Sequence, residues 1–237
     1  VTAGTDNIDD ILAATSGIVT ATVESATAVA LVNALENAKA NDALKLELTD
    51  TTAINAAHLL ALDGKTSVVV DVKNAVSITG TAADVKKLLA SKGVSLAKNV
   101  NITLDADTEV SAADVNAIAK ATTGVVTATV AAGTAAALNK ALGNATKDDA
   151  ITLVVSGKTA TAADLLALDG KTSKLVNAAE VETITGTVAD LKKVFAANTA
   201  STLELAADVA VSVSGTVKAS DLKDVLGGTT GAVTATV

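Results

Sequence analysis

The chain alternates between two spacings of apolar residues. In one kind of segment they recur at every second position, as at Leu44, Leu46 and Leu48, and this spacing predicts half-buried β-strands. Residues 100–104 and 209–213 follow the same alternation. Between such segments the apolar residues recur at three- and four-residue intervals, which predicts helices of two or three turns.

Ser or Thr followed three residues later by Asp marks several predicted helix starts. The pairs are Thr81 and Asp84, Ser111 and Asp114, Thr161 and Asp164, and Thr187 and Asp190. The hydroxyl can accept a hydrogen bond from an amide of the first turn, and the carboxylate favours the positive end of the helix dipole. We expect helices to begin near residues 6, 27, 55, 81, 111, 134, 162, 187 and 219, and glycines 64, 93, 124, 170 and 227 to mark helix ends.

One 107-residue sequence is repeated along the chain. Residues 24–130 and 131–237 are two full copies, and residues 1–23 match the end of a third. A long fixed period predicts an array in which each unit stacks on the next. We therefore expect one continuous array, and because the chain starts in mid-repeat we expect it to be a segment of a longer protein.

The order of the predicted elements indicates the fold class. Strands alternate with short helices and no hairpin signal separates them, which predicts parallel strands joined by right-handed crossovers. Counting the helix starts gives about four helix–strand rungs per 107-residue repeat. The sequence thus predicts an α/β protein, a right-handed solenoid with a parallel β-sheet.

The composition excludes several function classes. The chain has no Cys, which excludes disulfides and Cys-based metal sites. Its formal net charge is −8, whereas binding to nucleic acid or to an anionic membrane surface requires a basic face. Phe195 is the only aromatic residue, and no apolar run approaches the ~20 residues that span a bilayer. His58 is the only histidine, so neither a His-pair metal site nor a Ser-His-Asp triad can form. We expect His58 to face solvent in a first helical turn.

A Gly-Lys-Thr-Ser sequence, at 64–67 and again at 170–173, resembles the end of a phosphate-binding P-loop. A P-loop also needs a glycine five residues earlier, where this chain has Leu59 and Leu165. The segments are therefore predicted to be the end of a buried helix face followed by a glycine turn.

Asp105, Asp107 and Glu109 are the candidate calcium ligands, because carboxylates at alternate positions share one side of a strand. The second copy has Ser212, Ser214 and Thr216 there, so we interpret the three acids first as a solvated edge. A weak calcium site that bridges neighbouring molecules is the alternative. No other cofactor is expected.

An enzyme is not expected either, because paired carboxylates catalyse only within a cleft that perturbs their pKa values. The Thr-Ala-Thr triplets at 20–22, 127–129 and 234–236 are also found in ice-binding solenoids. They recur only on every fourth predicted rung, so we expect no flat threonine lattice. The high β propensity of threonine is the simpler reason for them.

The amino-acid sequence of the repeats resembles that of a known group of proteins. Segments 78–84, 111–118 and 126–130, rich in Ala, Thr and Val, are similar to repeats of large bacterial cell-surface proteins. That group includes surface-layer proteins and giant adhesin-like or extracellular matrix proteins. The resemblance implies export to the cell surface and a structural role in sheets, filaments or stalks.

Our leading hypothesis is a structural extracellular array that stacks and self-associates into a filament, a surface lattice or a stalk. The partner is then another copy of the chain, without nucleic acid and without membrane insertion. The alternative is a solenoid binding module, an adhesin that recognises a polysaccharide or a protein. An engineered consensus array is the third hypothesis, but the rungs are uneven in length and the copies differ at most positions.

Overall fold

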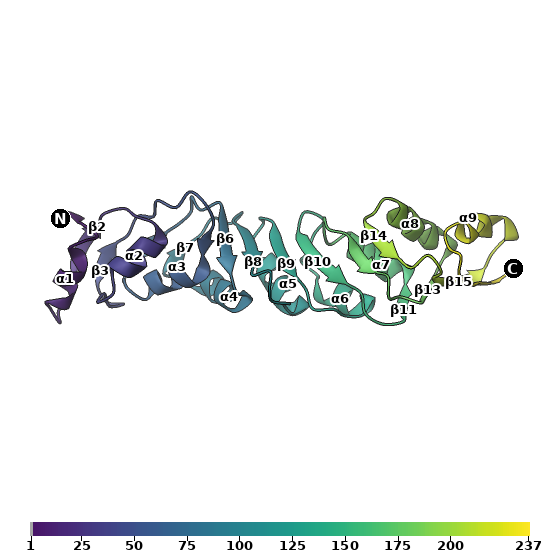
Figure 1. Cartoon of the computed structure of the whole chain (residues 1–237), viewed down its shortest axis with the longest axis horizontal. Helices are drawn as coiled ribbons and strands as arrows, with labels where there is room; N and C mark the ends of the chain where they lie inside the picture. Colours follow the sequence, from purple (N-terminus) through teal and green to yellow (C-terminus); the bar gives the residue numbers. More distant parts are fainter. Residues whose placement is uncertain (1) are drawn as a thin grey trace. The chain divides into compact units, whose positions relative to one another are not determined.

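The computed structural model describes residues 2–237 and has an α/β architecture (Figure 1). Among these residues nine α-helices and one 3-10 helix alternate with short strands, and every strand pairing is parallel. The chain divides into two compact units. Unit 1 contains the residues up to Asp105 together with Ala121–Val125, and unit 2 contains Ala106–Lys120 and Val126–Val237.

Unit 1 contains four helices and eight short strands among its described residues. In chain order they are β1 (Thr2–Ala3), α1 (Ile8–Ala13), β2 (Thr20–Val23), α2 (Ala28–Ala34), β3 (Ala43–Lys45), β4 (Ile54–Asn55), α3 (Ala56–Asp63), β5 (Val70–Asp71), β6 (Ser77–Gly80), α4 (Ala82–Ala90), β7 (Val94–Ser95) and β8 (Asn101–Leu104). Strands β1, β2 and β3 pair in that order, as do β4, β6 and β8, while β5 pairs with β7.

Unit 2 contains the remaining elements. They are α5 (Ala112–Ala121, whose last residue is assigned to unit 1), β9 (Val126–Thr129), α6 (Ala135–Ala141), β10 (Ala150–Val154), β11 (Thr159–Thr161), α7 (Ala162–Asp169), β12 (Val176–Ala178), β13 (Thr183–Gly186), α8 (Val188–Thr199), β14 (Leu203–Leu205), β15 (Ala210–Thr216), the 3-10 helix η1 (Ala219–Leu222), α9 (Lys223–Leu226) and β16 (Val233–Thr236). Strands β9, β10, β12 and β14 pair in that order, as do β11, β13, β15 and β16.

The helices begin where the sequence predicts. The hydroxyl of Thr81 accepts a hydrogen bond from the backbone N–H of Asp84, and the same bond recurs at the other Ser/Thr–Asp pairs. Each hydroxyl also donates to the carboxylate of its Asp, so two groups of the first turn are satisfied together. Eight of the nine expected starts coincide with a helix within about two residues, and at the ninth η1 precedes α9.

The expectation about glycine was right at three of five positions. Gly64, Gly170 and Gly227 are the C-cap residues of α3, α7 and α9, all in the right-handed conformation. Gly93 and Gly124 each lie three residues beyond the last residue of the preceding helix, α4 or α5. At Gly124 the backbone passes so close to the carbonyl oxygens of Asn99 and Val100 that no Cβ fits. Glycine is therefore required here by close packing and not by the end of a helix.

The core is made of aliphatic residues stacked from strand to strand. In unit 1, Ile54 pairs with Ile78 and Ile78 with Ile102, and all three are at most 3 % exposed. In unit 2, Ile184 pairs with Val211 in the same way. Burying each such side chain contributes about 1.5–3 kcal/mol, so these rows hold successive helix–strand segments together.

Two further features are the division between the units and the place of His58. The division between the units falls inside residues 24–130 and not at the repeat boundary after residue 130. His58 is the third residue of α3, in the first turn as expected, but its side chain is half-buried.

We predict that Gly124→Ala destabilises the protein by about 1–3 kcal/mol, because the new methyl group would overlap backbone oxygen of Val100 and Asn99. Gly231, at the equivalent place in unit 2, meets Asp208 and Val209 in the same way. The matched control is Gly143→Ala, where no atom lies within 4 Å of the added Cβ. Urea unfolding followed by circular dichroism measures the difference. Equal stability of the Gly124→Ala and Gly143→Ala proteins would contradict the close packing.

Candidate functional site

Most buried side chains of the described residues are aliphatic, but five polar ones are buried among them. Four of them form two pairs at matching positions of the two repeats, and all five lie at turns between a helix and the following strand. The five are Asp42, Thr66, Thr122, Asp149 and Thr172. None of the buried side-chain nitrogen or oxygen atoms of residues 2–237 lacks a hydrogen-bond partner, so each of these groups has a defined task.

Thr172, fully buried after α7, joins its turn to strand β10 of the preceding segment. Its hydroxyl donates to the carbonyl oxygen of Ile151 at 2.6 Å and accepts from the N–H of the same residue at 3.0 Å. It also accepts from the N–H of Lys174, two residues further on. The side chain thus behaves like an added backbone peptide group and extends the parallel ladder into the turn.

At three other turns a threonine hydroxyl likewise donates to a carbonyl oxygen of the preceding segment, and we call each of the four contacts a threonine clasp. Thr66 binds both backbone groups of Leu44, with distances of 2.8 and 3.0 Å. Thr122 and Thr229 donate to the carbonyl oxygens of Val100 and Val209, each at 2.6 Å. At all four clasps the next residue, Ser or Thr, donates its backbone N–H to the preceding segment. These clasps follow α3, α5, α7 and α9.

The turns after α2 and α6 use a buried aspartate instead. Asp42 is 1 % exposed, and its carboxylate accepts from the N–H of Val19 and of Lys39, both at 2.8 Å. Its backbone oxygen accepts from the N–H and hydroxyl of Ser67 in the following segment. The residue therefore connects three consecutive segments of unit 1.

Asp149 repeats this arrangement in unit 2. Its carboxylate accepts from the N–H of Val126 and of Thr146, both at 2.8 Å, and its backbone oxygen accepts from Ser173. A buried carboxylate without a cation partner is stable only when N–H groups solvate it, and these bonds supply that solvation. We call Asp42 and Asp149 the aspartate staples.

The two Gly-Lys-Thr-Ser segments are parts of these contacts, and the predicted helix end followed by a glycine turn is confirmed. After the C-cap glycine, the ammonium group of Lys65 donates to the carbonyl oxygen of Leu35, the C-cap residue of α2. Lys171 does the same to Leu142, the C-cap residue of α6. The motif therefore binds the end of the preceding helix with its lysine and the preceding strand with its threonine.

Helices are also connected directly in each unit. In unit 1, the carboxylate of Asp9 in α1 accepts from the backbone and side-chain N–H groups of Asn37, after α2. In unit 2, the side-chain oxygen of Asn116 in α5 accepts the same two bonds from Asn144, after α6. The contact is thus kept in both repeats, although the acceptor changes from Asp to Asn.

The ion pairs of the described residues lie on the surface, where they contribute little to stability. The hydrogen bond with Glu182 raises the pKa of Lys158, and the bond between Lys192 and Asp224 raises the pKa of the lysine and lowers that of the aspartate. The backbone N–H of Lys73 lowers the pKa of Asp71. None of these groups belongs to a clasp or a staple.

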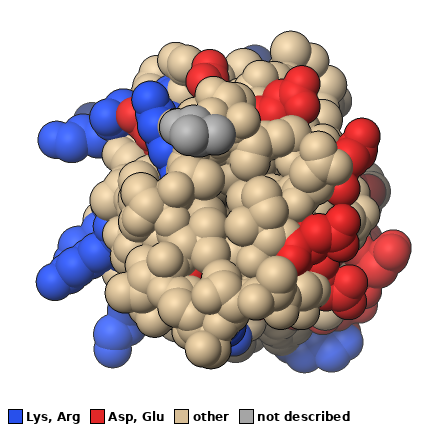
Figure 2. All heavy atoms as spheres, turned by 90° about the vertical axis from the view of Figure 1, so that its left-hand side faces the viewer, with Lys and Arg blue, Asp and Glu red and all other residues tan. Residues whose placement is uncertain are grey.

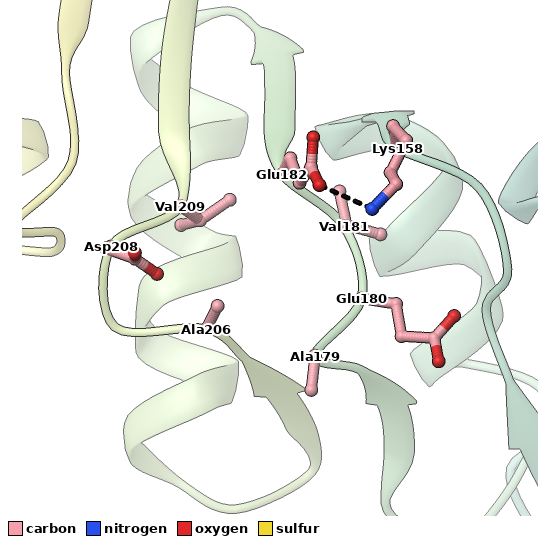
Figure 3. A pocket seen from close by; sticks show the side chains of 8 residues that line it. All are labelled: Lys158, Ala179, Glu180, Val181, Glu182, Ala206, Asp208 and Val209. Carbon is pink, nitrogen blue, oxygen red and sulfur yellow. Dashed lines mark hydrogen bonds and ion pairs between the residues drawn. The ribbon is translucent and has the colours of Figure 1, made fainter.

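A surface hollow of about 600 Å³ lies beside strands β11, β13 and β15 (Figure 3). Lys158 and Glu182 form an ion pair at its rim. Glu180 lies on the same loop as Glu182, and Asp208 lies on the opposite side of the hollow (Figure 3). By the strand register, Lys158 and Glu182 correspond to Thr52 and Val76 in the first repeat. The charged hollow is therefore specific to one copy.

The structure does not bring the three calcium candidates together as a site. Asp105 belongs to unit 1, whereas Asp107 and Glu109 belong to unit 2, and all three are exposed. Within residues 2–237 no group of three or more acidic, His or Cys side chains is placed to hold a metal ion. Calcium binding there stays a prediction. No helix within residues 2–237 is long and apolar enough to cross a bilayer.

Sequence reasoning missed one regular surface feature, a row of hydroxyl side chains. Strand pairing places Thr161, Thr185, Ser212 and Thr234 side by side across β11, β13, β15 and β16. The row is only one residue wide, because in the neighbouring row Thr183 pairs with Ala210, which has no hydroxyl group. Its members come from unrelated motifs, so only the register reveals it.

No family model, curated protein or solved structure matches this chain. The functional argument therefore depends on the clasps, the staples and the surface chemistry.

We predict that Thr172→Val destabilises the protein by about 1–3 kcal/mol, because valine keeps the shape but leaves the buried N–H of Ile151 and the part-buried N–H of Lys174 without their acceptor. Thr152→Val on the exposed face of β10 is the matched control, with an expected change within about 0.5 kcal/mol. Chemical denaturation measures both. If the two variants were equally stable, the clasp would have no energetic role.

We predict that Asp149→Asn also costs about 1–3 kcal/mol, because the amide presents only one oxygen where the carboxylate accepts bonds on both of its oxygens. Its neighbour Asp148 is exposed, and Asp148→Asn removes the same charge as a control. Thermal unfolding of the two variants separates the staple from a general effect of charge. A shift in Tm for Asp148→Asn as large as that for Asp149→Asn would argue against the staple.

Proposed function

We propose that the chain is a load-bearing structural segment of an extracellular repeat protein. The observation that carries this proposal is the set of threonine clasps and aspartate staples, which recur at matching places in the two repeats. The recurrence of buried contacts between successive segments supports a mechanical role.

The proposed architecture is a right-handed solenoid with about four rungs per 107-residue repeat. Parallel pairing of strands about two dozen residues apart supports it, as in the series Ile54, Ile78 and Ile102. The clasps support it too, because each joins residues 20–22 positions apart in the chain. In such an array the ladder, the aliphatic rows and the clasps all resist separation of neighbouring rungs.

The proposed location is the bacterial cell surface, in a filament, lattice or stalk. The resemblance of the Ala-, Thr- and Val-rich repeats to large surface proteins supports this location. The absence of cysteine and the acidic, hydroxyl-rich surface are compatible with an abundant exposed protein.

A binding module for a polysaccharide or protein is the second candidate function. The observation that favours it is the charged hollow beside β11, β13 and β15, because its side chains differ between the copies. Structural repeats tend to keep their exposed contacts, whereas binding faces diversify. The hollow has no aromatic or arginine anchor, so we rank this function second.

Single-molecule pulling between the two termini tests the load-bearing proposal. We expect stepwise unwinding in multiples of about 80 Å, since ~24 residues at ~3.4 Å each leave with every rung. The double variant Thr66→Val/Thr172→Val should unwind at lower force, and Thr152→Val should match the wild type. Identical force distributions for the wild type and the double variant would contradict the proposal.

A further inference from the structure

Successive helices of unit 2 point in one direction. In unit 2, helix α7 lies between the parallel strands β11 and β13, and α8 lies between the parallel strands β13 and β15. Each helix is followed by a further strand, β12 after α7 and β14 after α8, before the chain reaches the paired strand. The stretches from β11 to β13 and from β13 to β15 therefore repeat one arrangement, and α7 and α8 run parallel to each other. Their N-termini therefore share one edge of the unit and their C-termini share the opposite edge.

The edge at the helix N-termini is acidic. In unit 2, Asp114, Asp164 and Asp190 occupy first turns, and the exposed Asp107 and Glu109 directly precede α5. Unit 1 has Asp9, Asp10 and Asp84 in corresponding first turns. Capping explains the residue type, because a carboxylate stabilises the positive end of a helix dipole.

The edge at the helix C-termini is basic. In unit 2, Lys120 and Lys140 lie in the last turns of α5 and α6, and Lys147, Lys171 and Lys174 lie in the turns that follow α6 and α7. These five lysines outnumber the three carboxylates of the same turns, Asp148, Asp149 and Asp169. Asp149 is buried as a staple, and Asp169 is already paired with Lys147. On the face that Figure 2 shows, most Lys side chains lie on the left and most Asp and Glu side chains on the right, with some Lys side chains at the lower right as well.

We propose that this separation of charge is a lateral interface for a second copy of the chain, with the acidic edge of one molecule against the basic edge of the next. The inference rests on the proposed structural function and names its partner. Because the two edges of one molecule differ, the contact is heterologous, and it repeats by translation without closing. The product is an open sheet of molecules in the same orientation.

Whether salt weakens or strengthens assembly shows which of two electrostatic forces dominates, repulsion between whole molecules or attraction between their edges. The whole chain has a net charge of −8, and repulsion between copies weakens when salt is added. Attraction between complementary edges also weakens with salt. Assembly that dissolves in salt therefore requires edge attraction to dominate, whereas assembly that grows in salt requires repulsion between whole molecules to dominate.

Two triple variants reverse the edges without touching a clasp or a staple. Lys120→Glu/Lys140→Glu/Lys174→Glu makes the basic edge acidic. Asp107→Lys/Glu109→Lys/Asp221→Lys makes the acidic edge basic, since Asp221 also belongs to this edge, in the first turn of η1. The control Lys45→Glu/Lys158→Glu/Lys218→Glu changes the net charge as the first variant does, at exposed lysines outside the basic edge. Circular dichroism verifies that each variant is folded.

We expect the wild type to form sheets in about 0.01 M salt with EDTA, and to disperse in about 1 M salt, where the Debye length falls from about 30 Å to about 3 Å. Sedimentation and negative-stain electron microscopy detect the sheets. Each edge variant alone should lose the sedimenting fraction, the control should keep it, and an equal mixture of the two edge variants should recover it.

Three outcomes would overturn the inference: a wild type dispersed at low salt, sheets that grow with salt, or a mixture of edge variants that stays dispersed. A loss of assembly in the control variant would assign the effect to net charge and would equally overturn it. The pulling experiment is independent of these results. Normal unwinding forces with no sheets would remove the lateral interface and leave the load-bearing function standing.

Discussion

The structure depends on one requirement, that backbone groups at the turns between helices and strands find partners inside the protein. Strand ladders satisfy the backbone only where strands exist, and many strands here are two to four residues long. At six turns a Thr or Asp side chain supplies the missing donors and acceptors. Without them, each turn would bury unpaired peptide groups beside an otherwise adequate aliphatic core.

The composition of the core explains why side chains at the turns must pair with backbone groups. Ala, Val, Leu and Ile fill thin layers, and only Phe195 adds an aromatic ring. With small side chains the backbone of one segment lies close to that of the next, as the lack of room at Gly124 and Gly231 shows. Close backbones leave little space for water, so side chains of this protein must satisfy the peptide groups.

Local features could be read from the sequence because their partners are near in the chain. Thr81 caps an amide three residues away, and Leu44 and Leu46 alternate with exposed neighbours on one strand. The Gly-Lys-Thr-Ser segment could be recognised as a helix end, but not as a clasp. Thr172 acts on Ile151, 21 residues earlier, and no local pattern shows which carbonyl oxygen it meets.

The sequence by itself determined the α/β class, the places where helices begin and the alternation of the strands, because these follow from propensity and spacing over a few residues. It also determined the 107-residue repetition, which is visible as plain recurrence. Only the tertiary structure decided which peptide groups Asp42 and Asp149 bind, why Gly124 has no room for a side chain, and that helix capping places acids on one edge and lysines on the other. These properties depend on strand register, and register joins residues two dozen positions apart.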